Sequence, residues 1–122
     1  MFSERPYSHQ CFQLTVSHTC LAAIESWNLY TVPTGYDLFL DLATAQNSTT
    51  STGLLAFIHT FNAVVYRMGG LVTFTQYIVI PISSKIYIPS GAVVSCSVRG
   101  ITVNDIVNVS LFGTLMVAGQ WL

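Results

Sequence analysis

Apolar and polar side chains alternate with a period of two through the last part of the chain. Val107, Val109 and Leu111 would share one face of a strand, whereas Asn108 and Ser110 would share the other. An α-helix does not place residues two apart on one face, so this period indicates a β-strand with one buried side. The segments with this alternation are residues 12–17, 36–43 and 107–117.

Turn-forming residues interrupt these segments every 6–12 residues or so, a spacing typical of a β-sandwich or barrel. The strands predicted between the turns are residues 10–17, 24–32, 36–43, 54–61, 71–80, 85–89, 92–99 and 106–117. Residues 54–66 also fit a short helix, and their β-branched residues favour a strand. Gly69-Gly70 is interpreted as a turn, and the uncharged residues 44–53 as an exposed loop.

Two corner segments resemble each other: Val32-Pro33-Thr34-Gly35 and Ile88-Pro89-Ser90-Gly91. Each is interpreted as a type I turn with proline second and glycine fourth. Two similar corners suit two Greek keys, so the prediction is an all-β fold, a two-sheet antiparallel sandwich of the jelly-roll kind, with other sandwich topologies as the alternative. Residues 1–10 are expected to form an N-terminal arm and residues 11–122 a single β-sandwich domain.

Charged side chains are scarce. Lys and Arg number four and Asp and Glu five, which is 7% of the 122 residues, whereas a soluble domain is about 25% charged. Apolar residues make up 52%, which is more than a monomer of this size is able to bury. We therefore expect copies of the same chain, or other subunits, to cover much of its surface.

The same scarcity excludes several classes of partner. Nucleic acid and anionic lipid require clustered basic residues, and the single lysine is Lys85. The charge-free stretches Met68–Ser84 and Ile106–Leu122 are interrupted by polar residues, so no membrane span is expected. The first residues contain no apolar run after a basic segment, and no signal peptide is expected there.

Nothing in the sequence predicts an enzyme. Asp37 and Asp41 form the closest carboxylate pair, but four strand residues span ~13 Å, too far for paired catalysis. They are interpreted as solvated or inter-subunit positions. Ser17 and His18 are adjacent, so on a strand they point to opposite faces and form no nucleophile–base pair.

No metal and no cofactor are expected either. His9 with Cys11, and His18 with Cys20, are two separate pairs, whereas a structural zinc site needs about four converging ligands. Cys96 makes the cysteine count three, an odd number that argues against a disulfide framework.

Aromatic and apolar residues outside the predicted strands form the candidate interface. Trp and Tyr often anchor protein interfaces, whereas the ends of a domain are usually polar. We therefore hypothesise that the two ends dock onto a neighbouring subunit, the alternative being that they fold back onto their own sandwich. The candidate interface residues are Phe2, Tyr7, Trp121 and Leu122.

The corner segments and the closing Val109-Ser110-Leu111-Phe112-Gly113 resemble small β-sandwich proteins of virus particles, such as bacteriophage head decoration (cement) proteins, over about residues 27–117. The resemblance implies a structural virion protein that binds a capsid lattice and stabilises it. Its partners would be itself, in a homo-oligomer with a trimer favoured, and the major capsid protein or other virion subunits. Its location would be the capsid surface, after assembly in the host cytoplasm.

Other functions fit the same pattern. One is a glycan- or receptor-binding module of a tail or spike, which would need exposed tyrosines gathered beside polar groups. If those tyrosines are buried, this function loses support. Trimeric jelly rolls of the tumour-necrosis-factor and complement-head kind share the pattern, and a cupin-like enzyme would require bound metal. The tyrosines concerned are Tyr30, Tyr36, Tyr77 and Tyr87.

Overall fold

The structure is a computed structural model, and it describes residues 9–47, 53–74 and 78–118. These residues form strands and no helix, as the sequence predicts, and none of their segments is a helix suited to crossing a membrane. The strands are β1 (His9–Thr19), β2 (Ile24–Thr31), β3 (Tyr36–Asn47), β4 (Gly53–Phe61), β5 (Val64–Phe74), β6 (Ile78–Ile88), β7 (Val93–Arg99) and β8 (Ile106–Val117).

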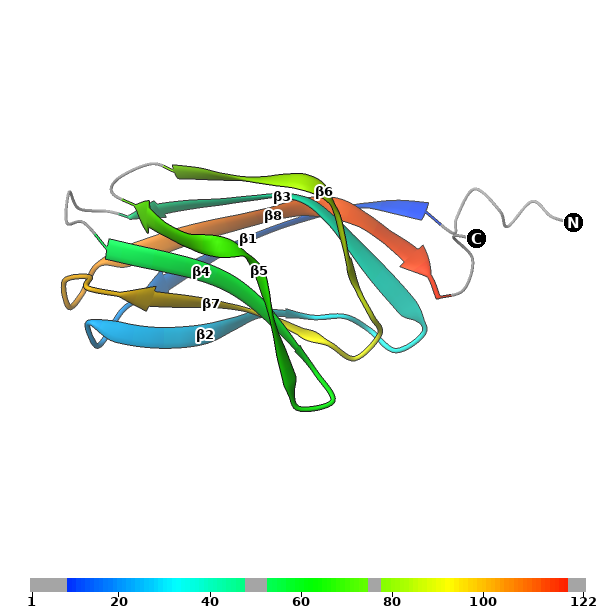
Figure 1. Ribbon diagram of the computed structural model, residues 1–122, viewed down its shortest axis with the longest axis horizontal. Helices are drawn as coiled ribbons and strands as arrows, with labels where there is room; N and C mark the ends of the chain where they lie inside the picture. Colours follow the sequence, from blue (N-terminus) through cyan, green and yellow to red (C-terminus); the bar gives the residue numbers. More distant parts are fainter. Residues whose placement is uncertain (1–8, 48–52, 75–77, 119–122) are drawn as a thin grey trace, which may run out of the picture.

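The strands form two four-stranded sheets that face each other (Figure 1). Their orders are β1-β8-β3-β6 and β2-β7-β4-β5, and every pairing is antiparallel. Only β4 and β5 are consecutive strands of one sheet, whereas every other connection crosses between the sheets. This is the order of a jelly roll with two Greek keys, so the predicted fold class is confirmed.

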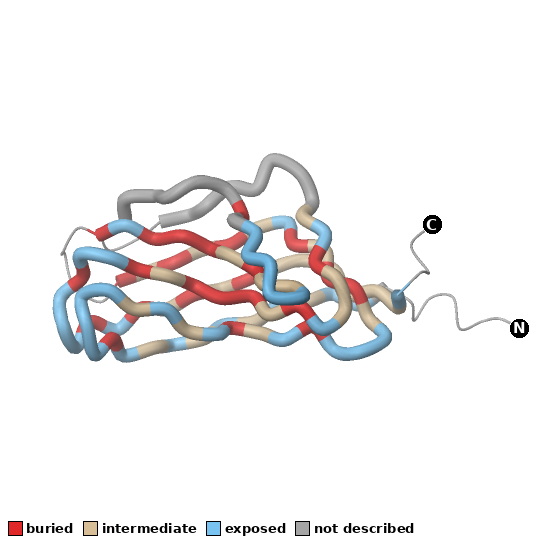
Figure 2. Tube along the Cα trace, turned by 60° about the horizontal axis from the view of Figure 1, so that its bottom comes forward, coloured by how far each residue is buried: buried red, intermediate tan, exposed pale blue. Residues whose placement is uncertain are grey.

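The predicted alternation places the core between the sheets. On β8, Val107, Val109 and Leu111 are buried, and the side chains between them are only partly buried. Figure 2 shows the buried positions alternating along the strands of the sandwich. Phe57 of β4 is the largest fully buried side chain among the described residues.

The corner at Pro33 is a β-turn, but of another type than the sequence suggested. The Tyr36 amide donates to the Pro33 carbonyl at 3.1 Å, which makes proline the first residue and glycine the third. Gly35 has φ 89° and Gly91 has φ 82° in the equivalent turn Pro89–Ala92. A positive φ at the third position belongs to a type II turn, so the type I prediction was wrong.

The two corners also bond to each other. The Val32 amide donates to the Ala92 carbonyl, and the Gly91 amide donates to the Val32 carbonyl, each at 2.9 Å. The repeated sequence therefore marks two turns that lie side by side at one end of the sandwich.

Residues 54–66 form the β4–β5 hairpin rather than one long strand. Phe61 pairs with Val64, and the two residues between them, Asn62 and Ala63, have φ 51° and 64°. Positive φ at both central residues is typical of a type I′ hairpin turn. Asn adopts this conformation readily, but Ala does not, which is why the sequence gives little sign of the turn.

The Gly69-Gly70 turn was a wrong prediction, because both residues lie within β5. Leu55 pairs with Val72 and Phe57 with Met68. Between these two pairs β4 therefore has one residue, whereas β5 has three. The glycines therefore occupy a β-bulge, a common use of glycine within a strand.

The predicted gap between strands 71–80 and 85–89, where Pro81 lies, is also absent, since β6 runs through it. β6 is the edge strand of its sheet, where a proline leaves few ladder bonds unmade. Leu40 pairs with Ile86 and Leu42 with Pro81. Between these two pairs β3 therefore has one residue, whereas β6 has four. The proline thus lies at a wide irregularity that the edge position tolerates.

Candidate functional site

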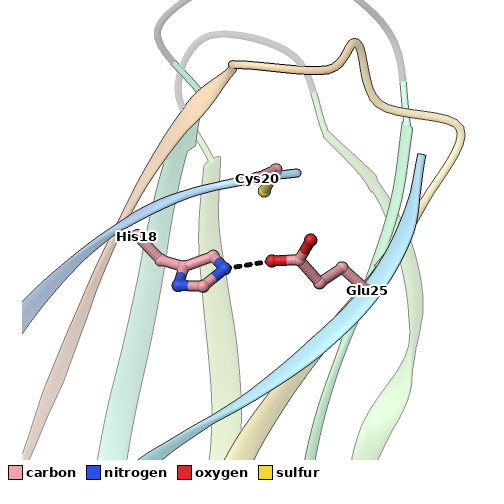
Figure 3. Close-up of side chains that lie close together, drawn as sticks. All are labelled: His18, Cys20 and Glu25. Carbon is pink, nitrogen blue, oxygen red and sulfur yellow. Dashed lines mark hydrogen bonds and ion pairs between the residues drawn. The ribbon is translucent and has the colours of Figure 1, made fainter. Parts of the chain in front are cut away.

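One end of the sandwich gathers three side chains of metal-binding types. His18 lies near the end of β1, Cys20 directly follows that strand, and Glu25 lies near the start of β2. One donor atom from each, a ring nitrogen, the thiol sulfur and a carboxylate oxygen, all lie within 4.8 Å of one another. Figure 3 shows the three side chains converging across the short β1–β2 connection.

Glu25 is the centre of this cluster. Its Oε2 pairs with Nε2 of His18, and its Oε1 accepts the amides of Leu21 at 2.8 Å and Ala22 at 3.1 Å. The hydrogen bond from His18, followed by that from the Leu21 amide, lowers the pKa of this carboxyl. The His18 ring stacks on Trp27, with ring centroids 4.2 Å apart and planes 11° apart.

Cys20 is fully buried. Burial, followed by the nearby carboxylates of Glu25 and Asp105, raises its pKa to about 11. A thiol with that pKa stays protonated at neutral pH. Burial, and then the Cys20 thiol, also raises the pKa of Cys96, and both cysteines are free.

A buried network joins this end to the β7–β8 loop. One carboxylate oxygen of Asp105 accepts from Asn47 Nδ2 and from the Thr102 amide, both at 3.1 Å. The Cys20 amide donates to the Asp105 carbonyl, and the Asn104 amide to the Cys20 carbonyl, each at 2.8 Å.

The prediction of an exposed loop over residues 44–53 was wrong in its first part. β3 continues to Asn47, whose side chain is buried.

Asp37 was interpreted as a solvated or inter-subunit position, but its side chain is buried within its own sandwich. Its Oδ1 accepts the Ser90 amide at 3.3 Å and the Tyr87 hydroxyl at 3.4 Å. Asp41, the other carboxylate of the pair, is exposed. Asp37 thus holds the second corner against β3, a structural role that requires no second carboxylate.

A cavity of about 480 Å³ opens at the other end of the sandwich, beside the edge strands β5 and β6. Nδ1 of His59 is buried there without a hydrogen-bond partner. The His59 ring stacks on Tyr66, with centroids 4.9 Å apart, and burial lowers its pKa. The side chains that line the cavity are His59, Phe61, Tyr66, Tyr87 and Pro89.

The tyrosines proposed to gather on the surface do not do so as a group. Tyr30 and Tyr36 pack against the core, Tyr87 is exposed beside the cavity, and Tyr77 lies outside the described residues. The second cavity tyrosine is Tyr66, which sequence reasoning missed because the β4–β5 turn was not recognised.

The missed residue of the other cluster is Glu25. It lies five positions after Cys20, across a tight connection between strands that face each other in different sheets. The sequence spacing placed only His18 and Cys20 together as possible metal ligands and did not indicate Glu25 as a third. The proposed interface residues Phe2, Tyr7, Trp121 and Leu122 lie outside the described residues, so their docking stays a prediction.

Exposed large apolar side chains lie on two sets of segments, the loops at one end of the sandwich and the β4–β5 hairpin at the other (Figure 1). At the first end they lie on the β1–β2 and β7–β8 loops, which Cys20, Asn104 and Asp105 bond together. We call this set the loop patch: Leu21, Ile24, Val103 and Ile106. The set at the other end lies on and beside the β4–β5 hairpin, and we call it the hairpin patch: Val64, Val65, Tyr66 and Tyr87.

The buried His59 makes stability depend on pH. In the unfolded chain its pKa is near 6.5, and burial lowers it in the folded state. As the pH falls below about 6.5, the unfolded chain takes up a proton that the folded chain does not, so the free energy of unfolding decreases. We expect this decrease between pH 7 and 5 in urea titrations, and a smaller one in His59→Gln. Equal slopes for both proteins would contradict the assignment.

No protein-family model matches this chain, and no curated protein sequence matches it. Among solved structures it is similar to a structure of infectious bursal disease virus, Gt strain, with TM-score 0.43 and 11% identity, over 93% of this chain and 34% of that chain. It is also similar to the VP2 subviral particle of infectious bursal disease virus, with TM-score 0.30 and 10% identity, over 89% of this chain and 41% of that chain. This chain thus spans about a third of the length of the first.

Proposed function

We propose that this chain is a structural subunit of a virus particle that binds a capsid lattice and reinforces it as a decoration protein. The observation that carries the proposal is the exposed apolar side chains of the loop patch and the hairpin patch. Exposed large apolar side chains that lie on the same or adjoining segments favour an interaction site. Two such patches allow one to bind a copy of the chain while the other binds the lattice.

The fold and composition support this assignment. Jelly rolls are frequent in viral capsid proteins, although the fold by itself specifies no function. With 7% charged residues, association must come from apolar contact. A stable interface buries about 1,200–2,000 Å², and burial contributes ~25 cal/mol per Å² before the cost of association.

A homotrimer that contacts the major capsid protein is the arrangement we favour. Three copies would present three lattice-binding patches together, and linked weak contacts bind far more tightly than one. Apolar association also depends little on ionic strength, because screening acts on charges.

Light scattering at several concentrations, followed by sedimentation with capsids, tests the proposal. We expect the wild-type chain to form a closed oligomer and to bind. Val65→Glu in the hairpin patch and Leu21→Glu in the loop patch are each expected to abolish either oligomer formation or capsid binding, a different one for each variant. Gln13→Glu adds the same charge at an exposed β1 position and is expected to change neither.

The contrary outcomes are specific. A wild-type monomer at high concentration that also fails to bind capsids overturns the proposal. Unchanged assembly and binding in both patch variants overturn the role of the patches. A tenfold change in affinity between low and moderate salt contradicts an apolar mechanism.

A second candidate function is glycan binding at the His59 cavity. Its volume of about 480 Å³ lies within the usual range for ligand sites, about 300–1,000 Å³. Aromatic walls can stack on a sugar ring, and the His59 ring forms part of the wall of this cavity. Titration with neutral monosaccharides, observed by NMR, tests it: Tyr66 and Tyr87 resonances should shift in the wild type and not in His59→Gln. No shift at high sugar concentration excludes this function.

A further inference from the structure

We propose that His18, Cys20 and Glu25 form a binding site for a zinc ion, with water as the fourth ligand. The inference is independent of any role in assembly, because it depends only on the convergence of three donor atoms at one end of the sandwich. A metal was not expected from the sequence, since the spacing of His and Cys residues supplied too few ligands.

The chemical types of the donors favour zinc. Zn²⁺ binds imidazole nitrogen, thiolate sulfur and carboxylate oxygen, whereas Mg²⁺ and Ca²⁺ prefer oxygen alone. Three protein ligands with one open position are a common zinc arrangement. The set here has one donor of each type.

The three donors are near enough for small side-chain movements to place them around one ion. Tetrahedral zinc separates neighbouring donors by about 3.3–3.6 Å, given bond lengths of ~2.0–2.3 Å. The three donors lie within 4.8 Å of one another, so to hold the ion the hydrogen-bonded pair of His18 and Glu25 would open and the Cys20 thiol would move closer. The ion would displace the proton between His18 Nε2 and Glu25 Oε2 (Figure 3) and also the proton of the Cys20 thiol, since a bound metal deprotonates a coordinating thiol, and both protons would pass to solvent.

The surroundings already orient two of the ligands. Glu25 Oε1 is held by the amides of Leu21 and Ala22, which leaves Oε2 as the ligating oxygen. The His18 ring is held by stacking on Trp27. Such outer contacts fix ligand direction in metal sites, and losing them usually costs 10–100-fold in affinity, as an order of magnitude.

The site is reachable and joins separate parts of the fold. The side chains of His18 and Glu25 are 29% and 18% exposed, so an ion can enter from the solvent side. Cys20 is bonded through its backbone to Asn104 and Asp105 of the β7–β8 loop. A bound ion would therefore connect β1, β2 and, through Cys20, the loop patch.

Titration of the full chain with Co²⁺ and Zn²⁺ tests the site, after a chelator has been removed by dialysis. We expect one ion per chain, with the visible absorption of tetrahedral cobalt and a near-ultraviolet thiolate band. Zn²⁺ should displace the cobalt and raise the thermal midpoint of unfolding. In Cys20→Ser the thiolate band should disappear and affinity should fall more than about tenfold.

Two further variants separate ligation from folding. Glu25→Gln keeps an oxygen for the Leu21 and Ala22 amides, so it should fold, and its affinity should fall by a similar factor. Cys11→Ser removes an exposed thiol on β1 and should leave both the thiolate band and the affinity unchanged. Circular dichroism without metal checks that each variant is folded.

Several outcomes overturn the inference. It fails if the wild-type chain binds no stoichiometric ion, because the cluster is then only a hydrogen-bonded pair beside a buried thiol. It also fails if the thiolate band persists in Cys20→Ser or disappears in Cys11→Ser. If Glu25→Gln is folded and binds the ion with wild-type affinity, the Glu25 carboxylate is not a ligand and the three-ligand site is contradicted.

Discussion

Replacing Gly113 by alanine is expected to lower the free energy of unfolding by about 3 kcal/mol, at the upper end of the usual cost of overpacking. Gly113 lies on β8 between Phe12 of β1 and Leu40 of β3. A Cβ built there would lie 2.0 Å from the Phe39 carbonyl oxygen and 3.0 Å from Leu40 Cα. Both atoms are backbone, so relief requires two strands to move apart.

The reason for the close approach is a bulge in β3. Leu40 pairs with Gly113 and Leu42 with Phe112, so Asp41 is an extra residue in β3 at this point. A bulge bends its strand and brings it nearer to its neighbour on one side. Domains of this size have a total stability of about 5–15 kcal/mol, so the variant would lose a large part of it.

Urea unfolding of Gly113→Ala beside Gly91→Ala measures this effect. Nothing lies within 4 Å of a Cβ built at Gly91, and its φ of +82° is the sole source of strain. The expected cost there is about 1–2 kcal/mol, the usual penalty of a left-handed residue. If Gly113→Ala proves no more destabilising than Gly91→Ala, the close contact does not constrain β8.

Phe57→Ala is expected to lower the free energy of unfolding by about 3–5 kcal/mol, because it removes a large buried ring and leaves a cavity. Phe57 is 2% exposed and belongs to β4, an inner strand of its sheet. It pairs with Cys96 on β7 and with Met68 on β5, at the edge of the β5 bulge. Rigid strands on both sides limit how far the site can collapse.

Thermal and urea unfolding of Phe57→Ala, Phe57→Leu and Val103→Ala make the comparison. Phe57→Leu leaves a smaller cavity and should cost less than the alanine variant. Val103 is half exposed in the β7–β8 loop, and its variant should change stability by less than about 0.5 kcal/mol. A Phe57→Ala protein as stable as Val103→Ala would show that the ring is not part of the core.

The sequence predicted the parts of this fold that depend on local periodicity. The buried Val107, Val109 and Leu111 follow directly from alternation, because side-chain direction on a strand has a period of two. The breaks were less predictable. Pro81 and Gly69 are turn residues by type, yet they lie in an edge strand and a bulge, where sheet position decides the outcome.

The candidate sites depend on contacts between strands that the sequence does not place side by side. Glu25 joins His18 and Cys20 only because β1 and β2 enter different sheets through a short connection. In the sequence His59 is one more alternating position of β4, and only its neighbours on β5 and β6 show that it lines a cavity. Local patterns predict strands, whereas sites require the order of strands.

The pairing of the first strand with the last has a consequence for biosynthesis. β1 is an edge strand whose sole neighbour in its sheet is β8, with His9 opposite Met116. On the ribosome β1 emerges before the other described strands and has no partner in its sheet until β8 has been made. Such distant pairing slows folding to milliseconds or seconds as a rough scale, and unpaired strand edges invite association. While it is being translated, each new chain therefore has a free strand edge that neighbouring nascent chains could pair with before its own β8 arrives.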